Sequence, residues 1–241
     1  MIIYGHRGAR FEAPENTIPG FAYARSLGLK AVEFDIRMTR DDQLVVIHDG
    51  TVDRTTDGTG RVCDLTFDQI RELDARSIFP DFPEKCQVPT FDEVLDEVGD
   101  LDQLEIEIKK DQLGRSEEVA TALLETLDRH HVDADVTVTS FHVESLRLVQ
   151  RLAPEQKRGY IGEWDCSAWL DIASWLGASR AGVSQVTGSR SVAAAAQEAG
   201  LMVHGWPCNT EEQLRMFEQW GVDAICADAP TTIMELAERA A

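Results

Sequence analysis

The stretch from residue 31 to residue 48 reads Ala-Val-Glu-Phe-Asp-Ile-Arg-Met-Thr-Arg-Asp-Asp-Gln-Leu-Val-Val-Ile-His. Two apolar runs, 31–39 and 44–48, flank the polar turn 40–43, which leaves no room for a helix. Such a pattern is typical of an antiparallel hairpin. The hairpin matters for the fold because the other strands of the chain are separated by helical segments and not by a short turn.

Elsewhere, short runs rich in Ile, Val and Leu alternate with amphipathic stretches of helical spacing. Repeated strand–helix units predict parallel strands joined by right-handed crossovers. The candidate strands are 2–5, 31–36, 44–47, 104–108, 136–139, 158–161, 181–184, 201–206 and 223–227. Because the hairpin strand 44–47 is antiparallel, eight parallel strands remain. We therefore predict an α/β fold, a (β/α)8 TIM barrel.

The length of 241 residues suits one such barrel, which often has about 250 residues. Residues 49–89 show weak helical periodicity, so we expect a small insertion after the second strand. We expect this insertion to cover the barrel mouth, with Arg54 and Asp57 holding its loop by hydrogen bonds. The sequence thus predicts a single domain over 1–241, with the insertion at about 49–89.

The charge balance of 23 basic and 43 acidic residues gives a net charge of −20. Nucleic acids and anionic membranes attract basic surfaces, so we expect neither as a stable partner. No apolar run approaches the roughly 18 residues of a membrane span. Five cysteines without a C-x-x-C pair, and no export signal, indicate reduced thiols in the cytoplasm. Oligomeric state leaves no signal in the sequence.

Polar residues gather where the first strands end, which is where the active site of such a barrel lies. If Asp41-Asp42 forms a two-residue loop, Asp35 lies opposite His48 in the hairpin and shares its face. Glu33 lies two residues from Asp35 and points the same way. Glu107 comes from the neighbouring strand.

Three carboxylates this close repel one another unless a cation lies between them. Mg²⁺ and Ca²⁺ both prefer carboxylate oxygens, so Glu33, Asp35 and Glu107 are candidate ligands of either ion. His6 and His48 suit general acid–base work because imidazole titrates near neutral pH.

Arg7 and Lys109 are the cations that could hold an anionic substrate. Together with the metal ligands and the two histidines, they suggest hydrolysis of a phosphate ester. The remaining histidines are expected to lack acidic neighbours of this kind; they are His130, His131, His142 and His204.

These residues resemble the glycerophosphodiester phosphodiesterase family, of the small bacterial cytoplasmic kind. The family carries His-Arg, then Glu-x-Asp, then His. The matching segments are Gly5-His6-Arg7-Gly8-Ala9, Pro14-Glu15-Asn16-Thr17, Glu33-Phe34-Asp35, His48-Asp49, Asp53–Gly60, Val88–Phe91, Glu105–Lys109, Ser140-Phe141, Trp206, Asn209 and Gly221–Asp228. Two positions depart from the family pattern: Trp206-Pro207-Cys208-Asn209 replaces Trp-Thr-Val-Asn, and Glu105 replaces a common Asn.

The resemblance implies a TIM barrel with an insertion after the second strand. It implies hydrolysis of a small-molecule glycerophosphodiester to an alcohol and sn-glycerol 3-phosphate. It implies Mg²⁺ or Ca²⁺ on Glu33, Asp35 and Glu107, with His6 and His48 as acid and base. The implied substrate-binding residues are Arg7, Lys109, Trp206, Glu15 and Asn16. The released alcohol, and the choice between water and the glycerol hydroxyl as nucleophile, stay open.

Two alternatives compete with this interpretation. A lipid phosphodiesterase of the phospholipase or sphingomyelinase-D-like type needs an apolar or basic surface facing the membrane, and the sequence shows no obvious exposed aromatic loop. A non-catalytic barrel that binds phosphodiesters is expected to lack a histidine or a carboxylate of the set. Trp164 could line the mouth, whereas Trp169, Trp175 and Trp220 are expected in helices and in the core.

Overall fold

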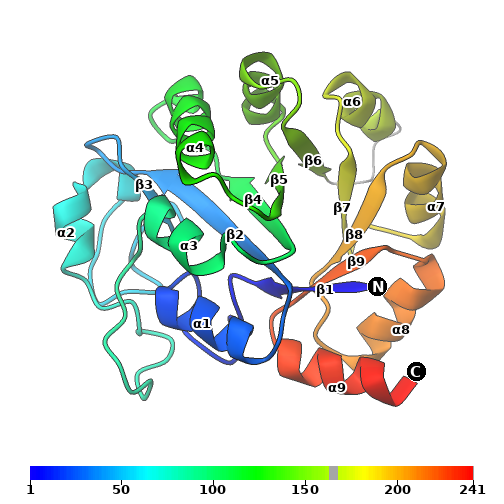
Figure 1. The fold of residues 1–241 in the computed structure, drawn as a ribbon, viewed down its shortest axis with the longest axis horizontal. Coiled ribbons are helices and arrows are strands. Elements are labelled where there is room, and N and C mark those ends of the chain that lie inside the picture. Colours follow the sequence, from blue (N-terminus) through cyan, green and yellow to red (C-terminus); the bar gives the residue numbers. More distant parts are fainter. Residues whose placement is uncertain (163–167, 241) are drawn as a thin grey trace.

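The alternation of strands and helices closes into a barrel in the computed structural model, which describes residues 1–162 and 168–240 (Figure 1). The strands are β1 (Ile2–His6), β2 (Ala31–Met38), β3 (Leu44–Val46), β4 (Gln103–Ile108), β5 (Asp135–Ser140), β6 (Lys157–Ile161), β7 (Arg180–Ser184), β8 (Met202–Trp206) and β9 (Ala224–Ala227). Their order is β1-β9-β8-β7-β6-β5-β4-β2-β3, and a further pairing of β1 with β2 closes the ring. All neighbours are parallel except β2 and β3, so the predicted eight-stranded parallel barrel is confirmed.

Helices surround the barrel, and each parallel strand is followed by one of them (Figure 1). They are α1 (Ile18–Ser26), α3 (Phe91–Val98), α4 (Ser116–His130), α5 (Val143–Leu152), α6 (Trp169–Trp175), α7 (Arg190–Glu198), α8 (Glu211–Trp220) and α9 (Pro230–Ala240). In α3, Thr90 and Glu93 form a capping box that begins the helix. Its buried side contributes Phe91, which contacts Phe34 of β2 at a ring distance of 6.1 Å. The apolar core therefore lies between the strands and the helices.

The hairpin is present, but the predicted register is wrong by one residue. The ladder pairs Ile36 with Val46 and Met38 with Leu44, so Asp35 lies opposite Ile47. Asp42 adopts a left-handed backbone conformation with φ of 62°. This conformation closes a three-residue loop between Thr39 and Gln43 instead of the expected two-residue turn.

The segment 49–89 contains a short 3-10 helix (Val62–Asp64) and the helix α2 (Phe67–Arg71). Apolar side chains of the segment, together with Val45 and Ile47 of the hairpin, form a small core of their own. Its polar side chains contact loops that follow strands: Arg54 bonds Glu15 after β1, and Arg61 bonds Gln112 after β4. These contacts place the insertion at the end of the barrel where the parallel strands finish.

The tryptophans are placed differently from one another. Trp169 is buried, and Trp220 packs edge-on against Phe217. Trp175 is helical but 56% exposed, under the guanidinium of Arg147 at 4.2 Å, so its expected place in the core is wrong. Trp164 lies outside the described residues. Among the helices that the structure describes, none is long and apolar enough to cross a lipid bilayer.

Candidate active site

Parallel pairing of β2 with β4 brings three carboxylates together. The register sets Asp35 beside Glu107, and Glu33 lies one step earlier on the same face of β2. Glu33, Asp35 and Glu107 each offer an oxygen within 4.8 Å of the others, and all three side chains are buried. The structure thus assembles the cluster that the sequence predicted at neighbouring strand ends.

Burial, mutual repulsion and the nearby cations shift the pKa values of these three carboxyl groups in opposite directions. Burial, with the charge of Asp35, raises the pKa of Glu107 to about 7 and the pKa of Glu33 well above its ordinary value. Burial acts on Asp35 in the same direction, but the charges of Lys109 and Arg7 outweigh it and lower its pKa. One carboxylate is therefore held ionised while its two neighbours favour the proton.

Lys109 supplies the positive charge at the centre of the cluster. Its Nζ lies 2.9 Å from Asp35 Oδ1 and 2.7 Å from Glu107 Oε1. An arrangement of buried carboxylate oxygens that already holds a cation fits a hard divalent ion such as Mg²⁺ or Ca²⁺. The donor set therefore agrees with the metal expected from the sequence.

Arg7, Glu15 and Asn16 form a layer behind the carboxylates. Arg7 Nη1 donates to Glu15 Oε1 at 2.9 Å, and its Nε lies 3.2 Å from Asp35 Oδ2. Asn16 Nδ2 donates to the same Asp35 oxygen at 2.9 Å. Arg7 lines the cavity described below, whereas Glu15 and Asn16 contact Arg7 and Asp35 from behind it.

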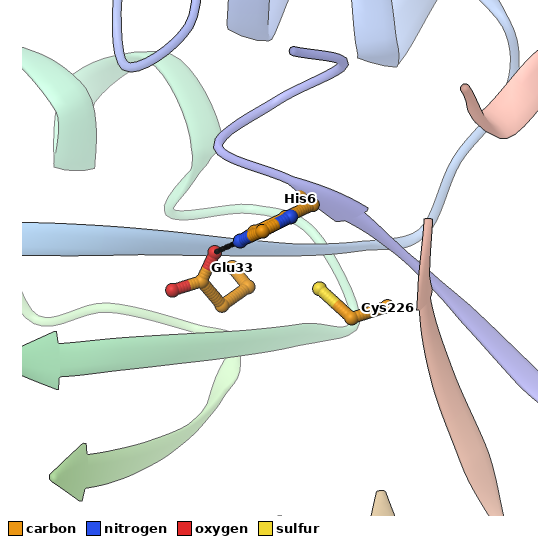
Figure 2. Close-up of side chains that lie close together, drawn as sticks. All are labelled: His6, Glu33 and Cys226. Carbon is orange, nitrogen blue, oxygen red and sulfur yellow. Dashed lines mark ion pairs between the residues drawn. The ribbon is translucent and has the colours of Figure 1, made fainter. Parts of the chain in front are cut away.

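His6 ends β1 and is oriented by a residue that follows β9. Its Nδ1 contacts Asp228 Oδ1. Its Nε2 lies 3.7 Å from Glu33 Oε2, the ion pair drawn in Figure 2. Asn209 Nδ2 in turn donates to Asp228 Oδ2 at 2.8 Å. Burial lowers the pKa of His6, and the hydrogen bond with Asp228 opposes part of that shift.

His48 follows the hairpin strand and is also paired with a carboxylate. Its Nδ1 lies 2.6 Å from Asp49 Oδ1, and Arg54 Nε donates to Asp49 Oδ2 at 2.6 Å. Burial lowers the pKa of His48 to about 4 despite the nearby charge of Asp35. At neutral pH the imidazole is therefore uncharged and able to accept a proton.

A cavity of about 220 Å³ connects these groups. It is lined by His6, Arg7, Arg10, Glu33, His48, Glu105, Glu107, Lys109, Phe141, Ile161, His204, Trp206, Pro207 and Cys226. Phe141 and Trp206 meet edge to face at 5.6 Å and form an apolar wall of the cavity. The cavity can therefore take a small molecule with one anionic and one less polar part.

The floor of the cavity is a buried polar network. Glu105 Oε2 lies 2.6 Å from His204 Nδ1 and accepts from Arg180 Nη1 at 2.9 Å. Arg180 Nη1 also donates to the hydroxyl of Tyr4 at 2.7 Å. The expectation that His204 lacks an acidic neighbour is wrong, because the barrel places β8 opposite β4. It is also wrong for His130 at the end of α4, whose Nε2 lies 2.9 Å from Asp92 Oδ1 of α3.

Asp228 and Cys226 were not among the candidate site residues, although both stand in the last matched motif. Asp228 follows β9 directly, so the rule that selected strand-end residues elsewhere could have selected it. Cys226 sits one residue inside the end of β9, paired in register with Tyr4. No sequence pattern indicated that its side chain faces His6.

Fold and site together define a class: a TIM-barrel hydrolase that acts on phosphodiesters. A family model described as the glycerophosphoryl diester phosphodiesterase family matches residues 6–232. The chain belongs to this family, as the sequence resemblance predicted. It is therefore an enzyme, and the hydrolysis of glycerophosphodiesters is its activity.

Proteins of known name or structure are similar to this chain along almost its whole length. A glycerophosphodiester phosphodiesterase of Caldanaerobacter subterraneus subsp. tengcongensis is 31% identical over 239 residues, covering 99% of this chain and 98% of the relative. A phosphodiesterase of Oleispira antarctica, solved in complex with the product sn-glycerol-3-phosphate, has a TM-score of 0.91 and 28% identity, covering 99% of this chain and 97% of that one. A crystal structure from Silicibacter pomeroyi, also described as a glycerophosphoryl diester phosphodiesterase, has a TM-score of 0.90 and 26% identity, covering 98% and 92%.

Proposed function

We propose that residues 1–241 act as one domain that hydrolyses a small-molecule glycerophosphodiester to an alcohol and sn-glycerol 3-phosphate with a divalent metal ion. One observation carries the proposal: the carboxylates of Glu33, Asp35 and Glu107 form one cluster, and the cavity beside it is lined by Glu33 and Glu107 together with His6 and His48. The product complex of the Oleispira antarctica relative supports a substrate of this size. In this proposal the insertion 49–89 shapes the cavity mouth. The net charge of −20 repels nucleic acids and anionic membranes, so neither is proposed as a stable partner.

Glu33, Asp35 and Glu107 are the residues that would hold the metal. Mg²⁺ or Ca²⁺ bound there would polarise a phosphoryl oxygen and offset charge in the transition state. Lys109 and Arg7 bring positive charge to the same wall of the cavity and would hold the phosphate. Trp206 forms the apolar wall, while Glu15 and Asn16 act on the substrate through Arg7 and Asp35.

His6 and His48 are the proposed acid and base. Each has its Nδ1 engaged by a carboxylate, Asp228 or Asp49, so the Nε2 atoms are left for proton transfer. One would take the proton of the nucleophile, which is water or the glycerol hydroxyl of the substrate. The other would give a proton to the leaving alkoxide.

The compartment proposed for this chemistry is the cytoplasm. Cys63, Cys86, Cys208 and Cys226 are free and buried, which supports a reducing environment. Glycerophosphodiesters with choline, ethanolamine, glycerol or inositol as the alcohol are the candidate substrates.

The decisive experiment is a coupled assay for glycerol 3-phosphate over this panel of substrates, with Mg²⁺, Ca²⁺ or a chelator. We expect activity that a chelator abolishes and one of the two ions restores. Asp35→Asn, which removes the ionised carboxylate of the cluster, should weaken metal binding measured by calorimetry and lower activity in parallel. Unchanged activity in chelator, or unchanged metal affinity in Asp35→Asn, would contradict the proposed site.

A second candidate, hydrolysis of lipid phosphodiesters, is favoured by one observation. Exposed apolar side chains lie on loops that follow strands, at the same end as the cavity: Phe11 after β1, Leu113 after β4, Phe141 after β5 and Val186 after β7. The sequence shows no obvious exposed aromatic loop, and this expectation is wrong for the loops that carry Phe11 and Phe141, which are 56% and 38% exposed. Adding a lysophospholipid to the panel, with wild type and Phe11→Ser, separates this candidate from the first.

A further inference from the structure

A second group of possible metal ligands lies beside the carboxylate cluster. His6, Glu33 and Cys226 each offer one ligand atom within 4.8 Å of the other two (Figure 2). They come from three adjacent strands, β1, β2 and β9. One nitrogen, one carboxylate and one sulfur form a donor set quite unlike the three carboxylates of the first cluster.

The chemistry of this set selects the metal. Mg²⁺ and Ca²⁺ bind oxygen and avoid sulfur, whereas Zn²⁺ takes imidazole, carboxylate and thiolate ligands in tetrahedral sites. Three protein ligands with a fourth position facing a cavity are the usual arrangement of an open zinc site. Here the cavity that His6, Glu33 and Cys226 all line provides that fourth position.

The surroundings of His6 provide an independent argument. In zinc sites, the nitrogen that does not bind the metal usually contacts a carboxylate, which fixes the ring. Asp228 contacts Nδ1 of His6 in this way. Asn209 fixes Asp228 by two bonds: its Nδ2 donates to Asp228 Oδ2 at 2.8 Å, and its Oδ1 accepts from the backbone N–H of Asp228 at 2.9 Å. His6 Nε2 is thereby directed toward Glu33, at 3.7 Å, and toward the sulfur of Cys226 (Figure 2).

We propose that His6, Glu33 and Cys226 form an inhibitory site for a thiophilic divalent cation such as Zn²⁺. On binding, the sulfur–metal bond forms and the thiol proton leaves to solvent. The cation also binds Nε2 of His6 and the carboxylate of Glu33, which belongs to the first cluster as well. Zn²⁺ therefore inhibits hydrolysis, and it competes with the ion that activates the enzyme.

Binding is tested without any activity measurement. Co²⁺, a spectroscopic substitute for Zn²⁺, should give a thiolate-to-cobalt charge-transfer absorption in the near ultraviolet with wild type, and Zn²⁺ should remove it. Cys226→Ala and Cys226→Ser should both lose the band and bind Zn²⁺ at least about tenfold more weakly by calorimetry. Cys86→Ala, which removes a buried thiol of the insertion, is the matched control and should keep both.

The inhibition arm rests on the proposed function and is measured separately. In the glycerol 3-phosphate assay, Cys226→Ala should keep its metal-activated turnover and need at least about tenfold more Zn²⁺ for half inhibition. A wild type without the cobalt band, or variants that bind Zn²⁺ as tightly as wild type, would overturn the site. A cobalt band lost in Cys226→Ala together with unchanged Zn²⁺ inhibition would overturn the inhibitory role, and neither result would touch the hydrolysis itself.

Discussion

At the scale of single residues, the position of Lys109 shows how the site tolerates its own charge. Its ammonium bridges Asp35 and Glu107, and Arg7 reaches Asp35 from the other side. Buried charges need partners, and these two cations provide them while also facing the cavity. The same residues that stabilise the carboxylates are therefore available to an incoming phosphate.

The first prediction at this scale concerns the two histidines. His6→Ala and His48→Ala should each lower kcat by about 10²–10⁴, because each removes one proton-transfer group. The pH profile of kcat/KM should be bell-shaped in wild type and lose one limb in each variant. Calorimetry should show nearly unchanged Mg²⁺ or Ca²⁺ affinity, since neither histidine belongs to the carboxylate cluster.

His131→Asn is the matched control, because His131 is exposed and its left-handed backbone at the end of α4 suits asparagine. It should leave kcat and the pH profile unchanged. Near-normal turnover in His6→Ala or His48→Ala would remove that histidine from the mechanism.

At the scale of elements, the hairpin and the insertion depend on a few side-chain bonds. Arg54 joins the insertion to the loop after β1 through two bonds to Glu15, of 2.7 and 2.8 Å, and also bonds Asp49. Glu15 is buried and bonds Arg7, and Asp49 contacts His48. This one guanidinium therefore links the insertion to the partners of both Arg7 and His48. We infer that Arg54 acts by positioning these residues.

The prediction at this scale is that Arg54→Met loosens the insertion locally. Charge-assisted hydrogen bonds contribute about 1.5–3 kcal/mol each where they are buried, and less where exposed. Amide exchange should accelerate at Val52 and Val62, which bond the backbone of Gly60 and Gly50. KM for the substrate should rise while the affinity for the metal stays the same.

Arg215→Met serves as the comparison, because Arg215 forms an exposed pair with Glu211 on the surface of α8. Its exchange rates and KM should match wild type. Protection of Val52 and Val62 that is equal in Arg54→Met and wild type would show that the apolar core of the insertion holds it without Arg54.

At the scale of the whole molecule, the barrel interior is filled by a polar network where bulky apolar residues are usual. Glu105 of β4, Arg180 of β7 and His204 of β8 meet at its centre, with Tyr4 of β1. Removing one partner of such a buried ion pair strongly destabilises the fold, because the other partner is left charged in a dry interior. The network therefore ties strands from opposite sides of the ring to one another.

The prediction at this scale is a pH-dependent loss of stability in Glu105→Gln. Burial alone would raise the pKa of Glu105, but His204 and Arg180 outweigh it and lower the pKa from 4.5 to about 2. A lowered pKa stabilises the fold above the unfolded value, and this contribution disappears as pH falls from 4.5 toward 2. The variant should lose about 3–5 kcal/mol at neutral pH by urea denaturation, and its difference from wild type should shrink below about pH 4.

Glu211→Gln is the control for this series, since Glu211 is exposed in its pair with Arg215. It should differ from wild type by less than about 0.5 kcal/mol at every pH. A Glu105→Gln difference that stays constant from neutral to acidic pH would show that packing, and not charge, accounts for the loss.

Much of this molecule could be predicted from local sequence. Apolar periodicity located the strands and helices, and the short turn at 40–43 identified the antiparallel strand that leaves eight for the barrel. Alternation along β2 placed Glu33 and Asp35 on one face, because a strand repeats every two residues. These features depend on neighbours within a few residues, so the chain determines them without any tertiary information.

Only the tertiary structure decided the rest. The hairpin register differs by one residue from the prediction, because Asp42 adopts a left-handed conformation that closes a three-residue loop. Asp228 reaches His6, Glu105 reaches His204, and Cys226 faces Glu33 across separations of 99 residues or more. Such contacts arise only when the ring closes, because the closure between β1 and β2 fixes which side chains meet in its interior.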